Sequence, residues 1–409
     1  MSDIAKQKFY WVPQDWNLKQ LKDIVTEARL GGNYSNSESG KGLPLIKMGN
    51  LGRGRISLNK VEYVSDEEIV AADDMLQTGD LLFNTRNSLD LVGKVAIWQD
   101  ELPKAAYNSN LLRYKFDSSN VFSNYFMNHL FNSHYALSQL RGFAIGTTSV
   151  AAIYARDMKR FYVALPSLPE QKKIADILSK WDEGIEKIEE LIDASKKLKK
   201  ALCQQLLTGK KRFKEFGGNA LNIDKLKKHL VECRGKNKQN NISTVLSVTN
   251  TRGFIEQSMQ FSRVVASKDL TTYKIIKRGE FGYNPSRINV GSVDLLTSFE
   301  TGILSPIYVI FKTKGSLTSE YLKHFLETHS FFEQMKHLTQ GTVRDNLSFD
   351  SLCQIKMFIP EINEQQKIAS VLNAADKEVE LLNNKLEALK QQKKGLMQKL
   401  LTGKIRVKV

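Results

Sequence analysis

Residues 170–212 read EQKKIADILSKWDEGIEKIEELIDASKKLKKALCQQLLTGKKR, and residues 364–406 read EQQKIASVLNAADKEVELLNNKLEALKQQKKGLMQKLLTGKIR. The two stretches align without a gap and share 20 of 43 residues. Repetition within one chain is interpreted first because it decides the architecture. The period is about half of the chain, so the sequence predicts two copies of one module, each ending in the same tail, and not a solenoid of short repeats.

The repetition continues more weakly through the segment in front of each tail. Asn84, for example, has its counterpart in Asn284. Each half of the chain is therefore a divergent front followed by a well-matched tail. We expect a front domain over residues 1–165 and a spacer helix over residues 166–213, followed by a second front domain over residues 214–358 and a second spacer helix over residues 359–409.

The repeated tail predicts a long helix with a coiled-coil seam. Apolar residues recur at spacings that alternate between four and three over about five heptads, which is typical of a coiled coil and not of a globular helix face. The predicted seam consists of Ile174, Leu178, Trp181, Ile185, Ile188, Ile192, Leu202 and Leu206 in the first copy and of Ile368, Leu372, Val379, Leu382, Leu386, Leu389, Leu396 and Leu400 in the second. Gly209 and Gly403 stand where a C-terminal cap is expected. Each helix would contain about 39 residues and span roughly 58 Å.

Two interpretations of this seam are open, a helix that dimerises with another chain or a pair of helices within one chain. Within one chain, the natural partner of each tail is the other tail. An internal pseudo-twofold axis would make the two helices antiparallel. We therefore predict an α+β protein in which two α/β domains are joined by two long antiparallel helices in a coiled coil.

Polar residues on the tails are repeated as well. Lys199 and Lys393 occupy the same seam position, where a charge lowers stability and often fixes register. The pair predicts either a registry device or a seam that opens toward another partner. The outer face of the first helix repeats in the second, and its repeated residues are Glu170, Lys173, Glu186, Lys196, Lys200 and Gln204. This repetition fits a solvated surface or a surface on which other subunits dock.

The charge of the chain indicates the class of partner. The 409 residues include 60 Lys and Arg against 44 Asp and Glu, which gives a formal net charge of +16. This balance favours a polyanionic partner, nucleic acid before a membrane surface. No run approaches the 18 apolar residues of a spanning helix, and the first residues lack the apolar stretch of a secretory signal. We expect a cytoplasmic protein.

Neither the cysteines nor the histidines form a metal-binding pattern. Cys203, Cys233 and Cys353 include no Cys-x-x-Cys pair and are too scattered for a disulfide framework. The 6 histidines include no His-Glu-x-x-His motif. The sequence therefore predicts no metal site and no cofactor.

Each front mixes short β-rich runs with a clear helical pattern. Residues 112–116 alternate as a strand, and residues 307–311 are apolar enough for a buried strand. Residues 120–141 and residues 318–338 are each predicted as one amphipathic helix. The fronts are thus expected to be small sheets with helices packed on them.

Polar residues gather in loops at matching places in the two fronts. Arg and Asn on a rigid loop are the side chains that make bidentate contacts to guanine and adenine edges. In the first front the candidate DNA-binding residues are Lys47, Asn50, Arg53, Arg55, Asn84, Arg86, Asn87, Lys94, Thr147 and Thr148. In the second front they are Thr249, Asn250, Arg252, Asn284, Ser286, Arg287, Asn289, Thr342, Arg344 and Asn346. Any one of these loops taken alone is also explained as a solvated loop, and their occurrence in both halves is what favours DNA contact.

The chain resembles the specificity subunits of type I restriction-modification systems. The resemblance rests on Gly-Asp-Leu-Leu-Phe at 79–83, on Pro-x-x-x-Glu-Gln-x-x-Ile-Ala at 166–175 and 360–369, and on the Leu-Leu-Thr-Gly-Lys end of each tail. It implies two target-recognition domains, each reading one half of a bipartite, asymmetric site in double-stranded DNA. It also implies a helical spacer that docks two DNA methyltransferase subunits, with restriction or translocase subunits added in the full complex.

An enzyme is the main rival to this interpretation. A DNA methyltransferase would need an Asn/Asp-Pro-Pro-Tyr/Phe motif, of which Asn284-Pro285-Ser286 is only a fragment. We therefore expect a non-catalytic recognition subunit of a methyltransferase and endonuclease complex. The alternative is a coiled-coil adaptor or scaffold that binds nucleic acid without sequence preference.

Overall fold

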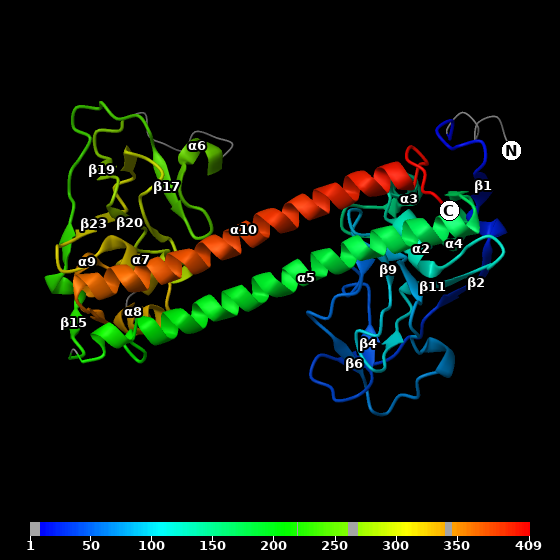
Figure 1. Cartoon of the computed structure of the whole chain (residues 1–409), viewed down its shortest axis with the longest axis horizontal. Helices are drawn as coiled ribbons and strands as arrows, with labels where there is room; N and C mark the ends of the chain where they lie inside the picture. The colour runs from blue at the N-terminus through cyan, green and yellow to red at the C-terminus, as the bar shows by residue number, and fades with distance from the viewer. Residues whose placement is uncertain (1–8, 219, 261–268, 340–345) are drawn as a thin grey trace. The chain divides into compact units, whose positions relative to one another are not determined.

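The computed structural model describes residues 9–218, 220–260, 269–339 and 346–409. The chain divides into two compact units, unit 1 with residues 1–188 and 385–409 and unit 2 with residues 189–384. Each unit therefore combines one front domain with the beginning of its own spacer helix and the end of the other spacer helix (Figure 1). Within the described residues, no helix is both long and apolar enough to cross a membrane.

The two spacer helices are equal in length. α5 (Leu168–Leu206) and α10 (Ile362–Leu400) contain 39 residues each and occupy matching positions of the repeat. Gly209 and Gly403 follow them with φ angles of +71° and +68°. A Cβ atom on Gly403 would lie 2.3 Å from Cγ of Pro13. The left-handed conformation and the close approach both favour glycine, which confirms the predicted caps.

The spacer helices pack in an antiparallel manner inside each unit. The core of unit 1 joins Ile174 and Leu178, near the start of α5, to Leu400 at the end of α10. The core of unit 2 joins Ile368, near the start of α10, to Leu206 at the end of α5. The same positions of the repeat thus meet in both units with the two helices exchanged, as twofold symmetry requires. The predicted fold class, two mixed α and β domains joined by two long antiparallel helices, is confirmed.

All of the predicted seam residues are buried or partly buried. The fully buried ones are Ile174, Leu178, Ile185, Ile188, Ile192, Leu206, Ile368, Leu372 and Leu400. The partly buried ones are Trp181, Leu202, Val379, Leu382, Leu386, Leu389 and Leu396. Burial is therefore complete where a front packs on the helices, near their ends, and extends to the middle of α5 but not to the middle of α10.

The front of unit 1 contains a five-stranded sheet in the order β2-β11-β7-β9-β5 and a four-stranded sheet in the order β10-β4-β6-β3. In the larger sheet only β5 and β9 pair in parallel. The strands are β1 (Asn17–Gln20), β2 (Val25–Leu30), β3 (Asn36–Ser37), β4 (Pro44–Ile46), β5 (Gly54–Arg55), β6 (Glu62–Val64), β7 (Leu81–Asn84), β8 (Arg86–Asn87), β9 (Val95–Ile97), β10 (Ala106–Tyr107), β11 (Leu111–Phe116), β12 (Ile145–Gly146), β13 (Ala151–Ala152) and β14 (Tyr162–Leu165). The helices are α2 (Asn124–Phe131), α3 (His134–Phe143) and α4 (Ala155–Met158).

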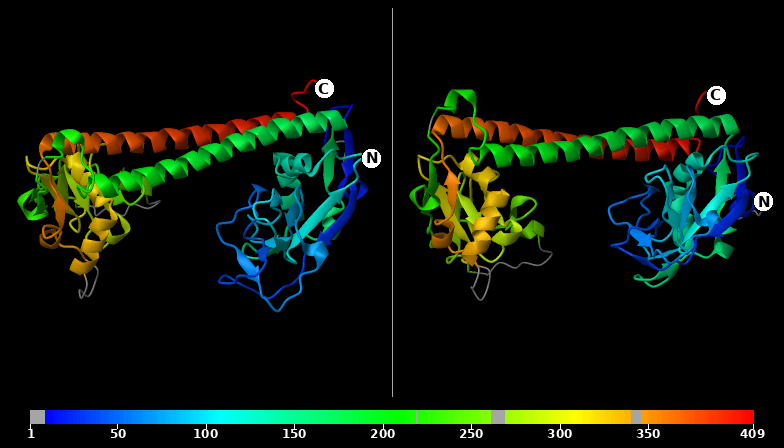
Figure 2. Two further views of the ribbon diagram at one scale, coloured as in Figure 1. Left: turned by 60° about the horizontal axis from the view of Figure 1, so that its bottom comes forward. Right: turned by 90° about the horizontal axis from the view of Figure 1, so that it is seen from below.

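The front of unit 2 repeats the central part of this arrangement. Its four-stranded sheet has the order β16-β23-β20-β21, which matches β2-β11-β7-β9 strand for strand. The strands are β15 (Ile223–Lys225), β16 (Leu230–Glu232), β17 (Leu246–Thr249), β18 (Gly253–Glu256), β19 (Lys274–Lys277), β20 (Phe281–Tyr283), β21 (Val293–Leu295), β22 (Thr301–Leu304), β23 (Val309–Thr313) and β24 (Lys356–Phe358). The helices are α6 (Gln257–Gln260), α7 (Ser319–Leu326), α8 (His329–Thr339) and α9 (Phe349–Leu352). In both units a short helix, α2 or α7, packs on this sheet (Figure 2).

The prediction of one amphipathic helix in each front is wrong, because each pattern forms two helices. α2 and α3 are separated at Ser133, whose Oγ accepts a hydrogen bond from the backbone N–H of Ala136 (3.4 Å). α7 and α8 are separated at Thr328, whose Oγ1 accepts one from the N–H of Phe331 (3.2 Å). A hydroxyl that satisfies a free N–H at a helix start favours a new helix at that residue. Apolar periodicity does not register such a break.

Candidate nucleic-acid interface

In each unit, an arginine that follows one spacer helix pairs with a buried glutamate near the start of the other spacer helix. In unit 1, Arg406 donates to both carboxylate oxygens of Glu170 (2.7 Å each) and to Asp15. In unit 2, Arg212 donates to Glu364 (3.0 and 2.5 Å). Hydrogen bonds to these carboxylates raise the pKa of both arginines. The prediction that Glu170 lies on the outer face is wrong, since the arginine from the other repeat draws this carboxylate into a buried pair.

The glutamine next to each of these glutamates ties the front domain to its helix. Gln171 accepts a hydrogen bond from the N–H of Phe122 (2.9 Å) and donates to the carbonyls of Asn120 and Pro166. Gln365 makes the same three contacts in unit 2, with Thr318, Ser316 and Pro360. Both side chains are buried. The repeated Glu-Gln dipeptide is therefore the joint between front and spacer.

A second polar contact of the joint contains a buried histidine in each unit. In unit 1, His129 of α2 lies 3.9 Å from Asp182 of α5, which is paired with Lys393 of α10. Burial lowers the pKa of His129 to about 3, and the charge of Lys393 acts in the same direction. The histidine is therefore neutral at physiological pH.

Unit 2 contains the counterpart of this contact. His324 of α7 lies 3.8 Å from Asp376, and Lys199 binds Asp376 (2.6 Å) and Glu327 (2.9 Å). The ligand atoms of His324, Glu327 and Asp376 lie within 4.8 Å of one another, but the Lys199 ammonium lies against both carboxylates. Each seam lysine is paired with an aspartate on the opposite helix, which is the arrangement that a registry device requires.

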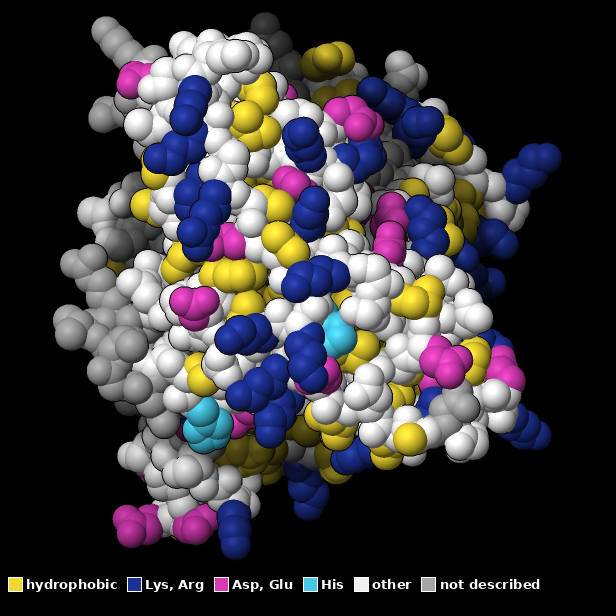
Figure 3. Space-filling model, turned by 90° about the vertical axis from the view of Figure 1, so that its left-hand side faces the viewer, with side chains coloured by type: hydrophobic (Ala, Val, Ile, Leu, Met, Phe, Trp, Pro, Cys, Tyr) yellow, Lys and Arg dark blue, Asp and Glu magenta, His cyan; other side chains and the backbone are white. Residues whose placement is uncertain are grey.

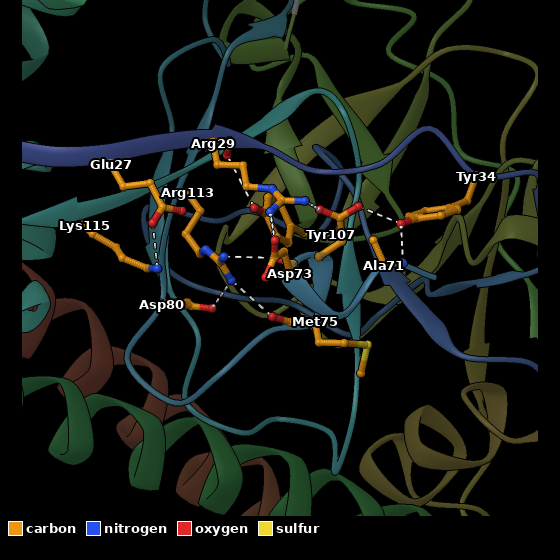
Figure 4. Close-up of polar contacts among 11 residues, drawn as sticks. Glu27, Arg29, Tyr34, Ala71, Asp73, Met75, Asp80, Tyr107, Arg113 and Lys115 are labelled. Atoms are coloured by element: carbon orange, nitrogen blue, oxygen red, sulfur yellow. Dashed lines mark hydrogen bonds and ion pairs between the residues drawn. The ribbon is translucent and has the colours of Figure 1, made fainter. Parts of the chain in front are cut away.

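A polar network fixes the sheet of unit 1 beneath its loops (Figure 4). Arg113 on β11 is buried and donates to Asp80 (3.1 Å) and to the carbonyls of Met75 (3.1 Å) and Asp73 (2.9 Å). Its guanidinium lies 5.2 Å from the centre of the Tyr107 ring. The aspartate of the Gly-Asp-Leu-Leu-Phe segment therefore holds neighbouring strands together. This role requires burial and does not place Asp80 at a DNA surface.

The three candidate loops of the first front come together in unit 1. β8, which contains Arg86 and Asn87, pairs with β13 of the β12–β13 hairpin. The N–H of Leu89 donates to the carbonyl of Thr148 (3.1 Å), which joins the loop after β8 to the hairpin tip. Arg53 donates to the carbonyl of Asp90 (3.4 Å) in the same loop. Loops that are up to 100 residues apart in the sequence therefore form one surface.

Several candidate residues shape these loops instead of lining the surface. Asn84 and Asn284 are buried, and each accepts a hydrogen bond (3.1 Å) from the N–H two residues later. Asn50 is also buried and donates to the carbonyls of Ser57 and Lys60. Direct contact of these three amides with a base is not compatible with this conformation. The identity of Asn84 and Asn284 in two otherwise divergent fronts was the available signal of a framework role.

Other candidates have partners within their own loop. Lys47 binds Glu62 (2.7 Å) and is half-buried. Thr249 accepts from the N–H of Arg252 (3.0 Å) and so closes a turn. Thr147 is exposed but bonds within its hairpin. Thr147 and the remaining described candidates can face a ligand. Asn87 and Lys94 are partly exposed, and the exposed ones are Arg53, Arg55, Arg86, Thr147, Thr148, Asn250, Arg252, Ser286, Arg287, Asn289 and Asn346.

Like charges crowd the surface of unit 1. Partial desolvation by the surrounding protein and the charge of the neighbouring Arg141 lower the pKa of the exposed Arg53, and partial desolvation and the charge of Arg53 lower the pKa of Lys94. Arg53 and Arg141 also line a hollow of about 1050 Å³ that reaches Lys394 on α10. Crowded cations are stabilised by an anion between them, and phosphate is the anion that nucleic acid provides. Sequence reasoning missed Arg141, because a cation in the last turn of a helix is common without a ligand.

The candidate loops of unit 2 also meet. Ser286 donates to the side-chain oxygen of Asn346 (2.5 Å), and Ser292 donates to the carbonyl of Val248, one residue before Thr249. Many Lys and Arg side chains are spread over the face of unit 2 seen in Figure 3, with Asp, Glu and hydrophobic side chains between them. Two further candidates, Thr342 and Arg344, lie outside the described residues. Both units therefore present a loop surface rich in Arg, Asn and hydroxyl groups.

Two mixed α and β fronts with polar, basic loops, joined by antiparallel helices, define a nucleic-acid recognition subunit. The model of the type I restriction modification DNA specificity domain family matches residues 13–197 and 302–391. The chain belongs to this family and is a type I restriction-modification DNA specificity subunit. The second match begins only within the second front, at residue 302.

Proteins of the same class match over the full length. The chain is 28% identical to a Methanocaldococcus jannaschii protein named "Putative type I restriction enzyme MjaX specificity subunit", over 97% of this chain and 95% of that protein. It is 25% identical to the type I restriction enzyme MjaVIII specificity subunit of the same organism, over 97% and 94%. The fold is similar to the crystal structure of the S subunit of a type I system from M. genitalium, with a TM-score of 0.59, 13% identity and 95% and 96% coverage. These relatives do not favour the alternative of an adaptor without sequence preference.

Proposed function

We propose that this chain selects a bipartite, asymmetric DNA site, with unit 1 reading one half-site and unit 2 reading the other. The observation that carries the proposal is the contrast between joints and loops. Glu170–Arg406 and Glu364–Arg212 are the same contact made twice, whereas the loops after β7 and β20 differ at most exposed positions. Recognition of two different half-sites requires a common framework that carries different base-contacting side chains in each unit.

The spacer helices are proposed to dock two DNA methyltransferase subunits, one on each repeated outer face. The repeated outer-face residues other than Glu170 remain exposed, and they are Lys173, Glu186, Lys196, Lys200 and Gln204 with Lys367, Glu380, Lys390, Lys394 and Gln398. Equivalent surfaces on two repeats fit two copies of one partner. Restriction or translocase subunits would join the same complex in the cytoplasm. A methyl-transfer assay on the purified chain alone tests the expected lack of catalysis, and methylation without added subunits would contradict it.

The central experiment is methylome sequencing of a host that carries this chain with its methyltransferase subunit. We expect methylation at a split motif with an unspecified central gap. Arg86→Ala and Arg287→Ala form a matched pair, since both residues are exposed in equivalent loops of different units. Each variant should reduce the discrimination between bases in one half-site only, by about 1–3 kcal/mol for a lost contact to a base edge. Asn87→Ala should behave like Arg86→Ala.

Two outcomes would contradict the proposal. If Arg86→Ala weakened both half-sites equally, the modular assignment of units to half-sites would fail. If no motif were methylated and affinity fell uniformly with salt on any DNA, binding would depend on phosphates alone. The second result would support the alternative function, an adaptor that binds nucleic acid without sequence preference.

A further inference from the structure

Exposed aliphatic side chains surround the recognition loops of unit 1. On the β12–β13 hairpin, Ile145 is 54% exposed and Val150 is 68% exposed. Leu89 and Leu91, in the loop after β8, are each 41% exposed. Isolated exposed aliphatics are common, but several on one small surface mark a binding site. This cluster was not predicted, because the sequence alone does not reveal which aliphatic loop side chains remain exposed.

Backbone hydrogen bonds hold these four side chains close to the predicted base readers. The N–H of Leu89 donates to the carbonyl of Thr148 (3.1 Å), so the loop after β8 lies beside the hairpin tip. The hairpin strand that follows Val150 pairs with Arg86 and Asn87 through Ala151 and Ala152. The aliphatic cluster and the polar readers therefore lie on neighbouring segments of one loop region, where one ligand can contact both.

The charges around the cluster favour DNA as its occupant. Arg86 is exposed, and Arg53, Lys94 and Arg141 lie near the same loops without an acidic partner among the described contacts. Asp90 is the carboxylate within the loop, and the cations outnumber it. A purely apolar protein partner would leave these cations unpaired, whereas the phosphates of a duplex neutralise them.

The apolar group that a major groove offers is the C5-methyl of thymine. We propose that the aliphatic cluster of unit 1, formed by Leu89, Leu91, Ile145 and Val150, packs against a thymine methyl group in its half-site. This inference rests on the proposed function and adds a base identity to it. The Arg and Asn side chains beside the cluster read hydrogen-bonding edges, and the aliphatic side chains read the methyl group. In unit 2 the position equivalent to Leu89 is the polar Asn289, and Val290 beside it is 54% exposed but stands without exposed aliphatic neighbours in the described part of that loop. The four-residue cluster, and with it methyl reading, is therefore assigned to unit 1.

Replacement of thymine by uracil tests this inference, because it removes one methyl group and leaves base pairing unchanged. The full chain, assembled with its methyltransferase subunit, is titrated with duplexes that carry the methylated motif and a single uracil at each thymine position in turn. Loss of one buried methyl group should weaken binding about fourfold at one position or more in the unit 1 half-site. Uracil in the unit 2 half-site is the internal DNA control.

Variants of the chain separate methyl reading from general weakening. Val150→Ser and Leu89→Ser should bind the thymine and uracil duplexes with nearly equal affinity, since the methyl group loses its apolar contact. Ile69→Ser is the matched control, because Ile69 is a 93% exposed aliphatic of the same unit outside the cluster. That variant should keep the full preference for thymine.

Three results would overturn the inference while the proposed function stands. They are a unit 1 half-site without a T·A pair, specific binding that is indifferent to uracil at every position, and variants that lose methyltransferase assembly but keep the thymine preference. The last result would identify the cluster as a protein interface. Absence of any sequence-specific binding is a different result, which would overturn the proposed function itself.

Discussion

Units 1 and 2 are the same at the joint and different at the loops. Each joint contains a Glu–Arg pair, a glutamine bonded to the front, and a His–Asp–Lys contact, all made from identical residues of the repeat. The loops after β7 and β20 share only their buried framework, such as Asn84 and Asn284. Positions that are identical in the two halves therefore maintain the shared framework, and positions that differ are available to contact different bases.

The frames are not equally strong. Asp80 and its counterpart Glu280 both cap a turn, by accepting from the N–H of Gln77 and of Lys277 (2.9 Å each), but Asp80 also pairs with the buried Arg113. Conversely, the Glu–Arg pair is more buried in unit 2, since Arg212 is largely buried and Arg406 is half-exposed. Substitutions at these positions should therefore affect one unit more than the other.

The largest effect is expected for Arg113→Met. The change removes three hydrogen bonds and leaves Asp80 buried without its cation, which costs about 3–5 kcal/mol of the free energy of unfolding of unit 1. All 4 tryptophans, Trp11, Trp16, Trp98 and Trp181, belong to unit 1. Urea unfolding followed by tryptophan fluorescence therefore reports unit 1 selectively. Equal loss of hydrogen-exchange protection in both units would contradict the independence of the two frames.

The next largest effect is expected for Glu364→Gln, which should destabilise unit 2 more than Glu170→Gln destabilises unit 1. Loss of the Glu364 carboxylate removes the two hydrogen bonds that it accepts from Arg212 and leaves this largely buried arginine with the weaker charge interaction of Glu361, which should cost about 3 kcal/mol locally. The Glu170 variant should cost less, because Arg406 keeps Asp15 as a partner (2.6 Å). Hydrogen exchange of peptides at the start of α10 and of α5 measures the two losses. A larger loss for Glu170→Gln would show that exposure of the arginine does not decide the strength of the joint.

A pH-dependent effect follows from the buried histidine of unit 1. Its folded pKa of about 3 lies below the unfolded value of roughly 6.5, so the unfolded state binds the extra proton between these values. The folded state therefore loses stability as pH falls below about 6.5, by at most about 1.4 kcal/mol per pH unit. His129→Asn should flatten the dependence of urea stability on pH between 6.5 and 4.5, measured by tryptophan fluorescence. His324→Asn, the matched change in unit 2, should leave that signal unchanged.

The smallest effect is expected for the seam lysines. Lys199 bridges two carboxylates, and the carboxylate partner found for Lys393 is Asp182. These pairs are partly exposed, so Lys199→Ala should cost about 1 kcal/mol and Lys393→Ala about 0.5 kcal/mol. Local hydrogen exchange of α5 and α10 measures the difference. If both substitutions stabilised the chain, the lysines would instead serve a partner that opens the seam.

The spacer helices were predictable because they depend on local and repeated patterns. The apolar spacing from Ile174 to Leu206 predicts a helix and its buried face, and Gly209 predicts its end. The division of the helical pattern at Ser133 was not predicted, because capping depends on one hydroxyl and not on periodicity. Among the loop residues, the sequence predicted the residue types but did not distinguish Asn84, which is buried, from Arg86, which is exposed.

By itself, the sequence determined that the chain is a duplication and that its tails are long helices, and its net charge favoured a polyanionic partner. These features follow from spacing, repetition and net charge, which do not require knowledge of distant contacts. Only the tertiary structure decided that Arg406 neutralises Glu170 across 236 residues, that His129 is buried beside Asp182, and that Leu89 lies beside Thr148. Such contacts join segments that are remote in the chain, and burial, which fixes the strength of an ion pair and the pKa of a histidine, exists only after those segments have packed.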